Sequence, residues 1–443
     1  MRTRLVLLVS ISLAVQAQDD PKDLLMRASQ KVLDTVNRLP KYMCTLSIDR
    51  AQYKTNAGFS TGSCDKLAAE KKAGHLKRRL FASDRLRLDV AIGTSHEIFG
   101  ATNEMYSWVG DNRFDNRGLF DLVQQGSIST GTFSTLLISI FGEDRATFSY
   151  NGDLTVDGRL LAEFGFRIPL EKSNYLYLFG NDRRQQVRAA AEGTFLVDWK
   201  TFDLVRLRVR HALPPEADAC ETSQVLDYGR VSLGGGDFLL ATEGRLNILS
   251  LTDEMENHMV YSACHEFTGE STLTFDPPLE PSRSGSDKSD PVIPALALPS
   301  GLPFRLAFLD RIDTTVAAAG DSIRAKLTAP IRARSSEVLV PEGAIVLARI
   351  VKARHLYGRD KSFVLEVKLE WAVAGGMSRP IRAMPDSGVR RFAKGAGRLS
   401  QRVELGPLNT TQDRETDVFE FPGAAPNYVI KSGLVSNWMT LGP

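Results

Sequence analysis

The sequence predicts a mainly β protein of the α+β class. We expect an N-terminal helix, an antiparallel open half-barrel with one internal helix, a linker, and a small all-β barrel or sandwich. Three observations predict this fold. Apolar and polar residues alternate over many segments, which is typical of antiparallel strands with one buried face. One segment near the N-terminus has a helical period instead. Between residues 277 and 303, prolines and serines replace the alternation.

Residues 1–17 have the composition of a secretory signal peptide. Arg2 and Arg4 give a basic start, residues 5–15 are apolar, and Ala17 ends the segment with a small residue. The apolar run is shorter than the roughly 20 residues that a membrane-spanning helix needs. We therefore expect cleavage after Ala17, a periplasmic or secreted location, and no transmembrane segment.

The length predicts two domains. The chain has 443 residues, of which 43% are hydrophobic and 24% are charged, as in folded globular proteins. One domain rarely exceeds about 250 residues. We expect a first domain at residues 20–276, a Pro/Ser-rich linker at 277–303 and a second domain at 304–443.

The charge is divided unequally along the chain. From Pro303 onward there are 21 Lys and Arg against 14 Asp and Glu, a balance of +7, and the preceding residues carry 34 against 39. Two interpretations stay open. The excess can be solvated surface charge, or the basic part can attract the acidic part or an anionic envelope surface.

The first domain is expected to begin with a helix over residues 22–38. Leu25, Val32, Val36 and Leu39 fall on one face, and the preceding Asp20 and Pro21 are typical of a helix start. Strands follow, as at residues 86–92 and 205–209, where apolar and charged residues alternate.

A second helix is predicted at residues 129–141. The apolar residues with helical spacing, which are the candidates for lining a ligand groove, are Phe133, Leu136, Leu137, Ile140 and Phe141. Such a helix either belongs to the core or forms a lid over a cavity.

Beyond the linker, alternation resumes at residues 365–371, and an apolar stretch at 345–351 follows a tight turn around Gly343. One last strand is expected over residues 428–441. These segments predict an all-β domain.

Four cysteines, in a chain expected to reach an oxidising compartment, predict two disulfides. Three pairings of Cys44, Cys64, Cys220 and Cys264 are possible. We favour Cys44–Cys64 and Cys220–Cys264, because each of these two pairs flanks a strand–turn–strand stretch. No Cys-x-x-Cys spacing indicates zinc, and we predict no metal site.

A dense basic cluster lies between residues 71 and 79. Its candidates for contact with an anionic surface are Lys71, Lys72, Lys77, Arg78 and Arg79. The alternative is a solvated hairpin. Nucleic acid is not an expected partner, because no aromatic residues are interleaved with these charges.

Most known catalytic motifs are absent. The sequence lacks Gly-x-Ser-x-Gly, Gly-x-Gly-x-x-Gly, P-loop and His-Glu-x-x-His patterns. We predict that the protein is not an enzyme and carries no cofactor. A hydrolase with a site assembled from scattered residues is the remaining enzymatic alternative.

The first domain resembles the LolA-like group of periplasmic lipoprotein carriers. The resemblance rests on the N-terminal helix, the strand series, and the segment from Asp198 through Thr201 to Val205, followed by Tyr228-Gly229. It implies an unclosed β-barrel with a hydrophobic groove. This chain is longer and carries four cysteines.

The second domain resembles the β-barrel of the VirB10/TrbI type, from envelope-spanning secretion channels. The matching residues are 320–327, with Ile323, Ala325 and Leu327, and 338–344, with Pro341 and Gly343. Since the membrane helix of those proteins is absent, a channel role is not implied. As a whole the chain is similar to two-domain exported bacterial proteins.

These observations lead to one main functional hypothesis. We expect a non-enzymatic envelope protein of a Gram-negative bacterium that binds a lipid, a lipoprotein or another hydrophobic ligand in its half-barrel. Its basic β domain would dock to an envelope partner. The alternative is a structural or assembly component with no small ligand. The oligomeric state is not predicted.

Overall fold

The structure is a computed structural model. It describes residues 20–40, 42–55, 63–92, 107–108, 128, 134–142, 144–179, 185–266, 298–359, 361–374, 377–386, 391–392 and 415–442. The predicted signal peptide, most of the predicted linker, and residues 129–133 with Phe133 lie outside the described residues.

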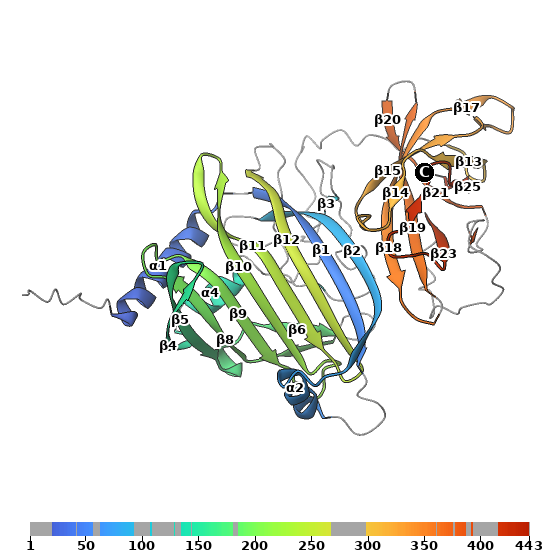
Figure 1. The fold of residues 1–443 in the computed structure, drawn as a ribbon. Coiled ribbons are helices and arrows are strands. Elements are labelled where there is room, and N and C mark those ends of the chain that lie inside the picture. The colour runs from blue at the N-terminus through green and yellow to red at the C-terminus, as the bar shows by residue number, and fades with distance from the viewer. Residues whose placement is uncertain are drawn as a thin grey trace, which may run out of the picture.

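The chain is mainly β, with a few helices, as the sequence predicts (Figure 1). The helices are α1 (Pro21–Arg38), α2 (Cys64–Lys72), α4 (Thr135–Phe141) and the short 3-10 helix η1 (Leu170–Lys172). The strands before the linker are β1 (Tyr42–Thr55), β2 (Arg78–Ile92), β3 (Ser107–Trp108), β4 (Thr147–Val156), β5 (Arg159–Ile168), β6 (Leu176–Phe179), β7 (Gln185–Arg188), β8 (Ala191–Asp198), β9 (Leu204–Ala212), β10 (Glu221–Leu233), β11 (Gly236–Leu249) and β12 (Asp253–Glu266).

The strands after the linker are shorter on average. They are β13 (Pro303–Phe308), β14 (Ile312–Asp313), β15 (Ser322–Leu327), β16 (Ile331–Arg332), β17 (Val338–Val340), β18 (Ile345–Leu356), β19 (Ser362–Ala374), β20 (Met377–Pro380), β21 (Ala383–Pro385), β22 (Arg391–Phe392), β23 (Thr416–Pro422), β24 (Val429–Ile430) and β25 (Val435–Thr440). The single last strand expected at 428–441 is two strands, because a turn with Gly433 at φ +91° divides it.

The long strands before the linker form one curved antiparallel sheet, called the large sheet below. Its order is β4–β5–β8–β9–β10–β11–β12–β1–β2. We call the face on which α1 and α4 pack the inner face, and the opposite face the outer face (Figure 1).

Helix α1 lies on this inner face. Asp20 caps it, since its Oδ1 accepts a hydrogen bond of 2.9 Å from the backbone N–H of Lys22. The buried side chains are Leu24, Ala28, Val32 and Val36, packed among residues of β5, β8 and β9. The predicted helix and its apolar face are confirmed, with Leu24 rather than Leu25 as the buried leucine.

The strands after the linker surround a core of their own, and we call residues 303–442 the C-terminal part. β18 pairs with β15 and β19, β13 pairs with β15 and β25, and β21 pairs with β25. The core holds Phe304, Phe308, Phe363, Phe419 and Trp438, among other buried residues.

The C-terminal part continues the large sheet at the edge of β2. Arg354, His355 and Leu356 of β18 pair in antiparallel register with Asp84, Ser83 and Ala82 of β2. The backbone N–H of Arg87 donates to the carbonyl of Ala319 at 2.8 Å, and the N–H of Ala319 donates to the carbonyl of Arg85 at 2.8 Å. The two parts are therefore joined by backbone hydrogen bonds.

Candidate functional site

The inner face of the large sheet is apolar across six neighbouring strands. One row of side chains in register runs from β9 to β2 and consists of Leu207, Leu226, Gly244, Met259, Ile48 and Leu86. The five side chains that exceed a hydrogen atom are at most 3% exposed. Gly244 sits in the middle, with Met259 and Leu226 closing the space where its Cβ would stand.

Helix α4 supplies most of the candidate groove residues. Leu137, Ile140 and Phe141 are buried against the inner face and Leu136 is half-buried. The ring of Phe141 lies edge-on to Phe195 of β8, with 5.0 Å between the ring centroids. The structure thus brings four of the five predicted residues to the inner face, and their role in ligand binding stays a prediction.

The row beside the apolar one is polar at the end next to the C-terminal part. Arg50 of β1 forms a two-pronged ion pair with Asp84 of β2, with Nε–Oδ1 and Nη2–Oδ2 distances of 2.6 and 2.9 Å. Arg354 of β18 donates to Gln52 Oε1 at 2.7 Å. Burial lowers the pKa of Arg354, and the positive charge of Arg50 adds to this effect despite the opposing charge of Asp84. This polar end marks where the C-terminal part joins the sheet.

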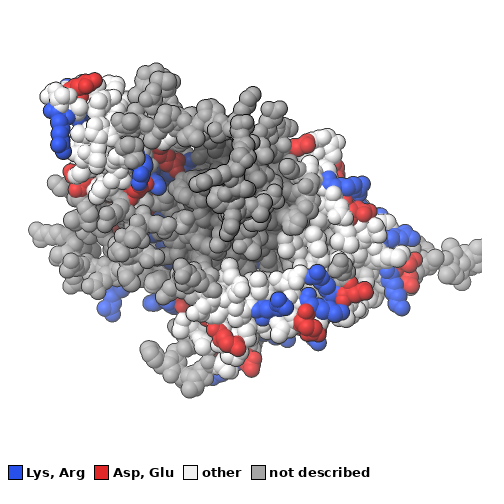
Figure 2. Space-filling model, turned by 180° about the vertical axis from the view of Figure 1, so that it is seen from behind, with Lys and Arg blue, Asp and Glu red and all other residues white. Residues whose placement is uncertain are grey.

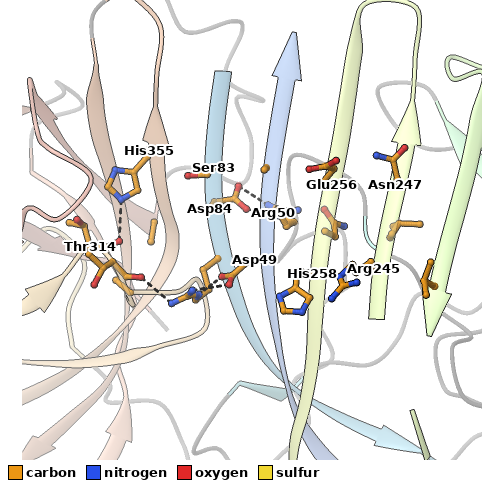
Figure 3. Close-up of a pocket in the computed structure, with 18 of the residues that line it drawn as sticks. Asp49, Arg50, Ser83, Asp84, Arg245, Asn247, Glu256, His258, Thr314 and His355 are labelled. Atoms are coloured by element: carbon orange, nitrogen blue, oxygen red, sulfur yellow. Dashed lines mark hydrogen bonds and ion pairs between the residues drawn. The ribbon is translucent and has the colours of Figure 1, made fainter. Parts of the chain in front are cut away.

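The outer face carries a cavity of about 630 Å³ beside the C-terminal part (Figure 3). Its floor comes from alternating positions of five strands, and its wall from the C-terminal part. The floor side chains are Asp49, Ala51, Ser83, Arg85, Ser223, Val225, Arg245, Asn247, Glu256 and His258, and the wall residues are Thr314, Thr315, Ala317, Ala353 and His355.

Charges of both signs line this cavity in pairs. Arg85 Nη2 lies 2.9 Å from Asp49 Oδ2, and Arg85 Nη1 donates to the carbonyl of Thr315 at 3.0 Å. His258 Nε2 and Arg245 Nη2 both contact Glu243 Oε1, at 2.8 and 2.7 Å. The hydrogen bond from His258 is the main reason that the pKa of Glu243 is lowered.

Both histidines that line the cavity, and the hydroxyl of Ser83, have hydrogen-bond partners. His258 is bound to a carboxylate, and His355 Nε2 donates to the carbonyl of Thr314 at 3.1 Å. The hydroxyl groups of Ser83 and Tyr357 form a hydrogen bond with each other, with 3.0 Å between their oxygens. Among the described residues, neither imidazole forms a hydrogen bond with a hydroxyl group, which is the contact through which a general base activates a serine nucleophile.

The cavity could not be found from sequence. Its residues come from β1, β2, β10, β11, β12 and the C-terminal part, and most of them are the polar positions of ordinary amphipathic strands. The alternation of polar and apolar residues was the sequence signal for this region. It indicates that one face of the strands is solvent-exposed, but it does not indicate which residues of that face lie against the C-terminal part.

The basic cluster is partly neutralised. Lys71 Nζ and Arg78 Nη1 lie 2.9 and 2.7 Å from the two carboxylate oxygens of Glu254, which is 2% exposed. Lys72, Lys77 and Arg79 are exposed. Burial would raise the pKa of Glu254, but the hydrogen bonds it accepts, that of Lys71 first, outweigh burial and lower it.

The predicted solvated hairpin in this region is wrong in part, because residues 64–72 form α2. Ser63 caps this helix by accepting from the N–H of Lys66 at 3.3 Å. The sequence carried this signal, since a serine precedes a run of good helix formers. Contact of the cluster with an anionic surface stays a prediction.

The two predicted disulfides exist, but the favoured pairing is wrong. Cys44 of β1 is bonded to Cys264 of β12, and Cys64 of α2 is bonded to Cys220, which directly precedes β10. β1 and β12, the first and last strands before the linker, pair with each other. Cys44 and Cys264 are therefore close in space although they are 220 residues apart in the sequence. Nearness in sequence was the wrong guide.

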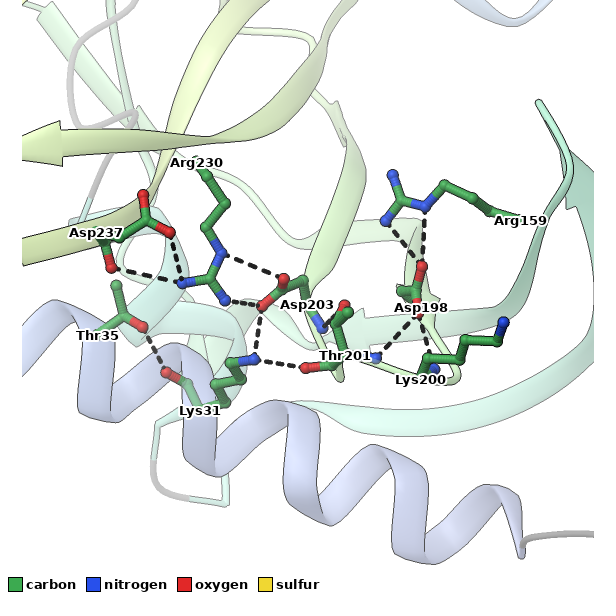
Figure 4. A network of polar contacts seen from close by, with 9 residues as sticks. All are labelled: Lys31, Thr35, Arg159, Asp198, Lys200, Thr201, Asp203, Arg230 and Asp237. Carbon is green, nitrogen blue, oxygen red and sulfur yellow. Dashed lines mark hydrogen bonds and ion pairs between the residues drawn. The ribbon is translucent and has the colours of Figure 1, made fainter.

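The turn at residues 198–203, which carries the LolA-like resemblance, has a structural role (Figure 4). Asp198 Oδ1 accepts from the N–H groups of Lys200 and Thr201 at 2.8 and 3.0 Å. Asp203 then binds Lys31 of α1 at 2.8 Å and Arg230 of β10 at 2.6 Å. These residues fasten α1 to the sheet.

Two further searches give limited findings. Among the described residues, no three His, Cys, Asp or Glu side chains are grouped as metal ligands would be. No described helix combines the length and apolar character needed to cross a bilayer.

The chain matches no family model and no curated protein. Among solved structures it is similar to a putative outer membrane lipoprotein-sorting protein domain from Vibrio parahaemolyticus, with 10% identity and a TM-score of 0.27 over 56% of this chain and 94% of that one. It is also similar to a LolA superfamily protein from Nitrosomonas europaea, with 9% identity and a TM-score of 0.22 over 55% of this chain and 91% of that one.

The lipoprotein LppX of Mycobacterium tuberculosis matches with 11% identity and a TM-score of 0.20, over 56% of this chain and 99% of that one. All these identities lie below 25% and the TM-scores below 0.5, so membership of a family is not established. The similarity of the C-terminal part to the VirB10/TrbI type likewise stays a prediction.

Proposed function

We propose that the protein is a non-enzymatic carrier that binds a hydrophobic ligand or a lipid-modified partner against the inner face of the large sheet. The observation that carries this proposal is the apolar row across six strands, with α4 lying on the same face. An acyl chain placed there gains about 0.8 kcal/mol for each buried methylene. No charged residue interrupts the row.

Helix α4 covers part of the inner face, and such a ligand would displace it or bind beside it. It has seven residues, and an isolated helix of fewer than about 12 is unstable in water. Its position therefore depends on packing of Leu137, Ile140 and Phe141 onto the sheet. A ligand that offers the same apolar contacts can replace part of that packing at small net cost.

The two disulfides support an exported location, because such bonds form and persist outside the reducing cytosol. The C-terminal part, with its excess of basic residues, would dock the carrier to an envelope partner. In Figure 2, charges of both signs are scattered over the described parts of the rear surface, so docking there would need matched pairs rather than a single-sign field.

Native mass spectrometry of the mature protein, purified from its own periplasm, tests the carrier. We expect an added lipid-sized mass that solvent extraction removes and identifies. In a fluorescent fatty-acid assay, Ile140→Ser should weaken binding, while Ile138→Ser, on the exposed side of the same helix, should not. Circular dichroism confirms that both variants are folded. A bare protein that also fails to bind the fatty acid would refute the carrier.

A structural or assembly component is the second candidate. The observation that favours it is that the apolar row is already buried in the protein itself. It predicts a bare mass in the same experiment, together with a stable partner recovered by crosslinking in cells.

A further inference from the structure

The small sheet of β6 and β7 presents leucines to solvent (β6 in Figure 1). Leu176 and Leu178 are 46% and 42% exposed, and Leu170, in η1 just before β6, is 51% exposed. On the wet face of an antiparallel strand, polar residues are expected. Several large apolar side chains exposed within one short segment therefore indicate a surface that meets something apolar.

Tyr177, on the opposite face of β6, and Tyr175, just before β6, are held by β9, β10 and the loop between them. Tyr177 OH donates to Asp218 Oδ1 at 2.8 Å, and Tyr175 OH lies 2.9 Å from Thr222 Oγ1. Tyr175 also stacks on His211, with ring centroids 3.5 Å apart. The leucines are thus held outward on a rigid support, so little conformational entropy is lost when they bind.

Cations accompany these leucines. Arg188 of β7 pairs in register with Leu176, and directly opposite residues of an antiparallel pair share a face. Lys172 of η1 donates to the carbonyl of Asp144 at 2.6 Å. No carboxylate in the described part of the chain forms an ion pair with Lys172 or Arg188, although Glu171 lies next to Lys172.

We propose that Leu170, Lys172, Leu176, Leu178 and Arg188 form a docking surface for an anionic lipid bilayer. The leucines enter the apolar boundary of the bilayer, and the two cations meet lipid phosphates in the headgroup layer. Exposed leucines beside cations that have no carboxylate partner among the described residues match the apolar boundary and the phosphate layer of a bilayer. The inference goes beyond the proposed carrier, because docking does not require a filled groove.

Cosedimentation of the full mature chain with vesicles tests the surface. We expect binding to vesicles of phosphatidylglycerol and phosphatidylcholine, and weaker binding to phosphatidylcholine alone. The double variant Leu176→Ser/Leu178→Ser should bind at least about tenfold more weakly, since burial of the exposed halves of the two leucines together contributes about a factor of ten or more. Leu251→Ser removes a leucine that is 45% exposed in the β11–β12 turn, and should bind as the native chain does.

A charge variant tests the second half of the proposal. Lys172→Glu/Arg188→Glu should lose binding to the anionic vesicles and the salt dependence of that binding, whereas Arg188→Lys should keep both. Equal loss with Leu251→Ser, or a native chain that binds no anionic vesicle, would overturn the surface. Fatty-acid binding is measured on the same variants. It should not change, which separates a failure of docking from a failure of the carrier.

Discussion

The guanidinium of Arg87, on β2, forms an ion pair with the carboxylate of Asp321, which directly precedes β15. The other oxygen of Asp321 accepts a hydrogen bond of 3.0 Å from the N–H of Ala318. Ala319 follows, and its backbone bonds to β2 on both sides of Leu86. One carboxylate therefore shapes the turn that joins the two parts of the chain and also ties it to the large sheet.

Asp321→Ala should loosen this junction specifically. We expect a loss of about 1 kcal/mol in the free energy of unfolding, because the ion pair is partly exposed and its partner can rehydrate. The amide protons of Arg87 and Ala319, which bond across the junction, should exchange faster with solvent. Hydrogen–deuterium exchange measures both.

Asp310→Ala is the matched control. Asp310 pairs with Arg324 inside the C-terminal part, at 2.6 Å, and bonds to no described residue of the large sheet. If both variants speed exchange at Arg87 equally, Asp321 has no special role at the junction.

The disulfide pairing predicts a definite peptide map. Proteolysis without reduction should yield linked fragments that join Cys44 to Cys264 and Cys64 to Cys220. The double variant Cys64→Ser/Cys220→Ser should lose about 2–4 kcal/mol of stability, because the bond closes a long loop of the unfolded chain. Exchange in α2 should rise, since Leu67 is the buried residue that remains to hold it.

Cys44→Ser/Cys264→Ser provides the comparison. It should lose a similar free energy but leave exchange in α2 unchanged, because this bond joins β1 to β12. A fragment that links Cys44 to Cys64 would contradict the structure.

Gly193 of β8 marks a close approach of two strands. A Cβ at this position would stand 1.9 Å from the carbonyl oxygen of Arg208, a backbone atom that cannot swing away. Gly193→Ala should therefore cost about 1–3 kcal/mol, the usual range for overpacking a fitted interior. Thermal or denaturant unfolding measures this loss. Gly358→Ala, where nothing lies within 4 Å, should be nearly neutral, and equal losses would show that Gly193 is not constrained.

Local patterns predicted most elements of this fold. The alternation over residues 86–92 predicts a strand with Leu86 and Leu88 on one face, because a strand has a side-chain period of two. The helix of residues 21–38 is set by its Asp20 cap and its apolar face. Such signals lie within a few residues of one another, so they can be extracted from one sequence.

Pairings between distant segments could not be predicted. The contact of β1 with β12, which places Cys44 beside Cys264, depends on how the whole sheet closes. The pairing of β18 with β2 creates the wall of the outer cavity and depends on the free edge of a strand about 270 residues earlier in the chain. The leucines of β6 were missed for another reason: an apolar residue on a strand looks the same in sequence whether it faces the core or solvent.

His211 predicts an acid-sensitive step in stability. It is 5% exposed, stacks on Tyr175, and its Nδ1–H donates to the carbonyl of Ala190 at 3.1 Å. Burial lowers its pKa from 6.5 to about 4, and the bond to Ala190 opposes this only in part. In the unfolded chain, the imidazole of His211 is therefore protonated as the pH falls below about 6.5. In the folded chain it is protonated only near pH 4.

The free energy of unfolding should thus fall by up to about 3 kcal/mol as the pH drops from about 6.5 to about 4. Below about pH 4, the contribution of His211 should not change further. His211→Phe keeps the stacked ring but cannot be protonated, so its stability should change less between these two pH values. Denaturant unfolding across the interval measures the difference. The exposed His265→Phe should leave the native pH dependence in place. If His211→Phe keeps the full loss over this interval, His211 is not its source. Carboxylates such as Asp203, whose pKa is lowered because the hydrogen bonds from Lys31 and Arg230 outweigh its burial, should reduce stability mainly below about pH 4.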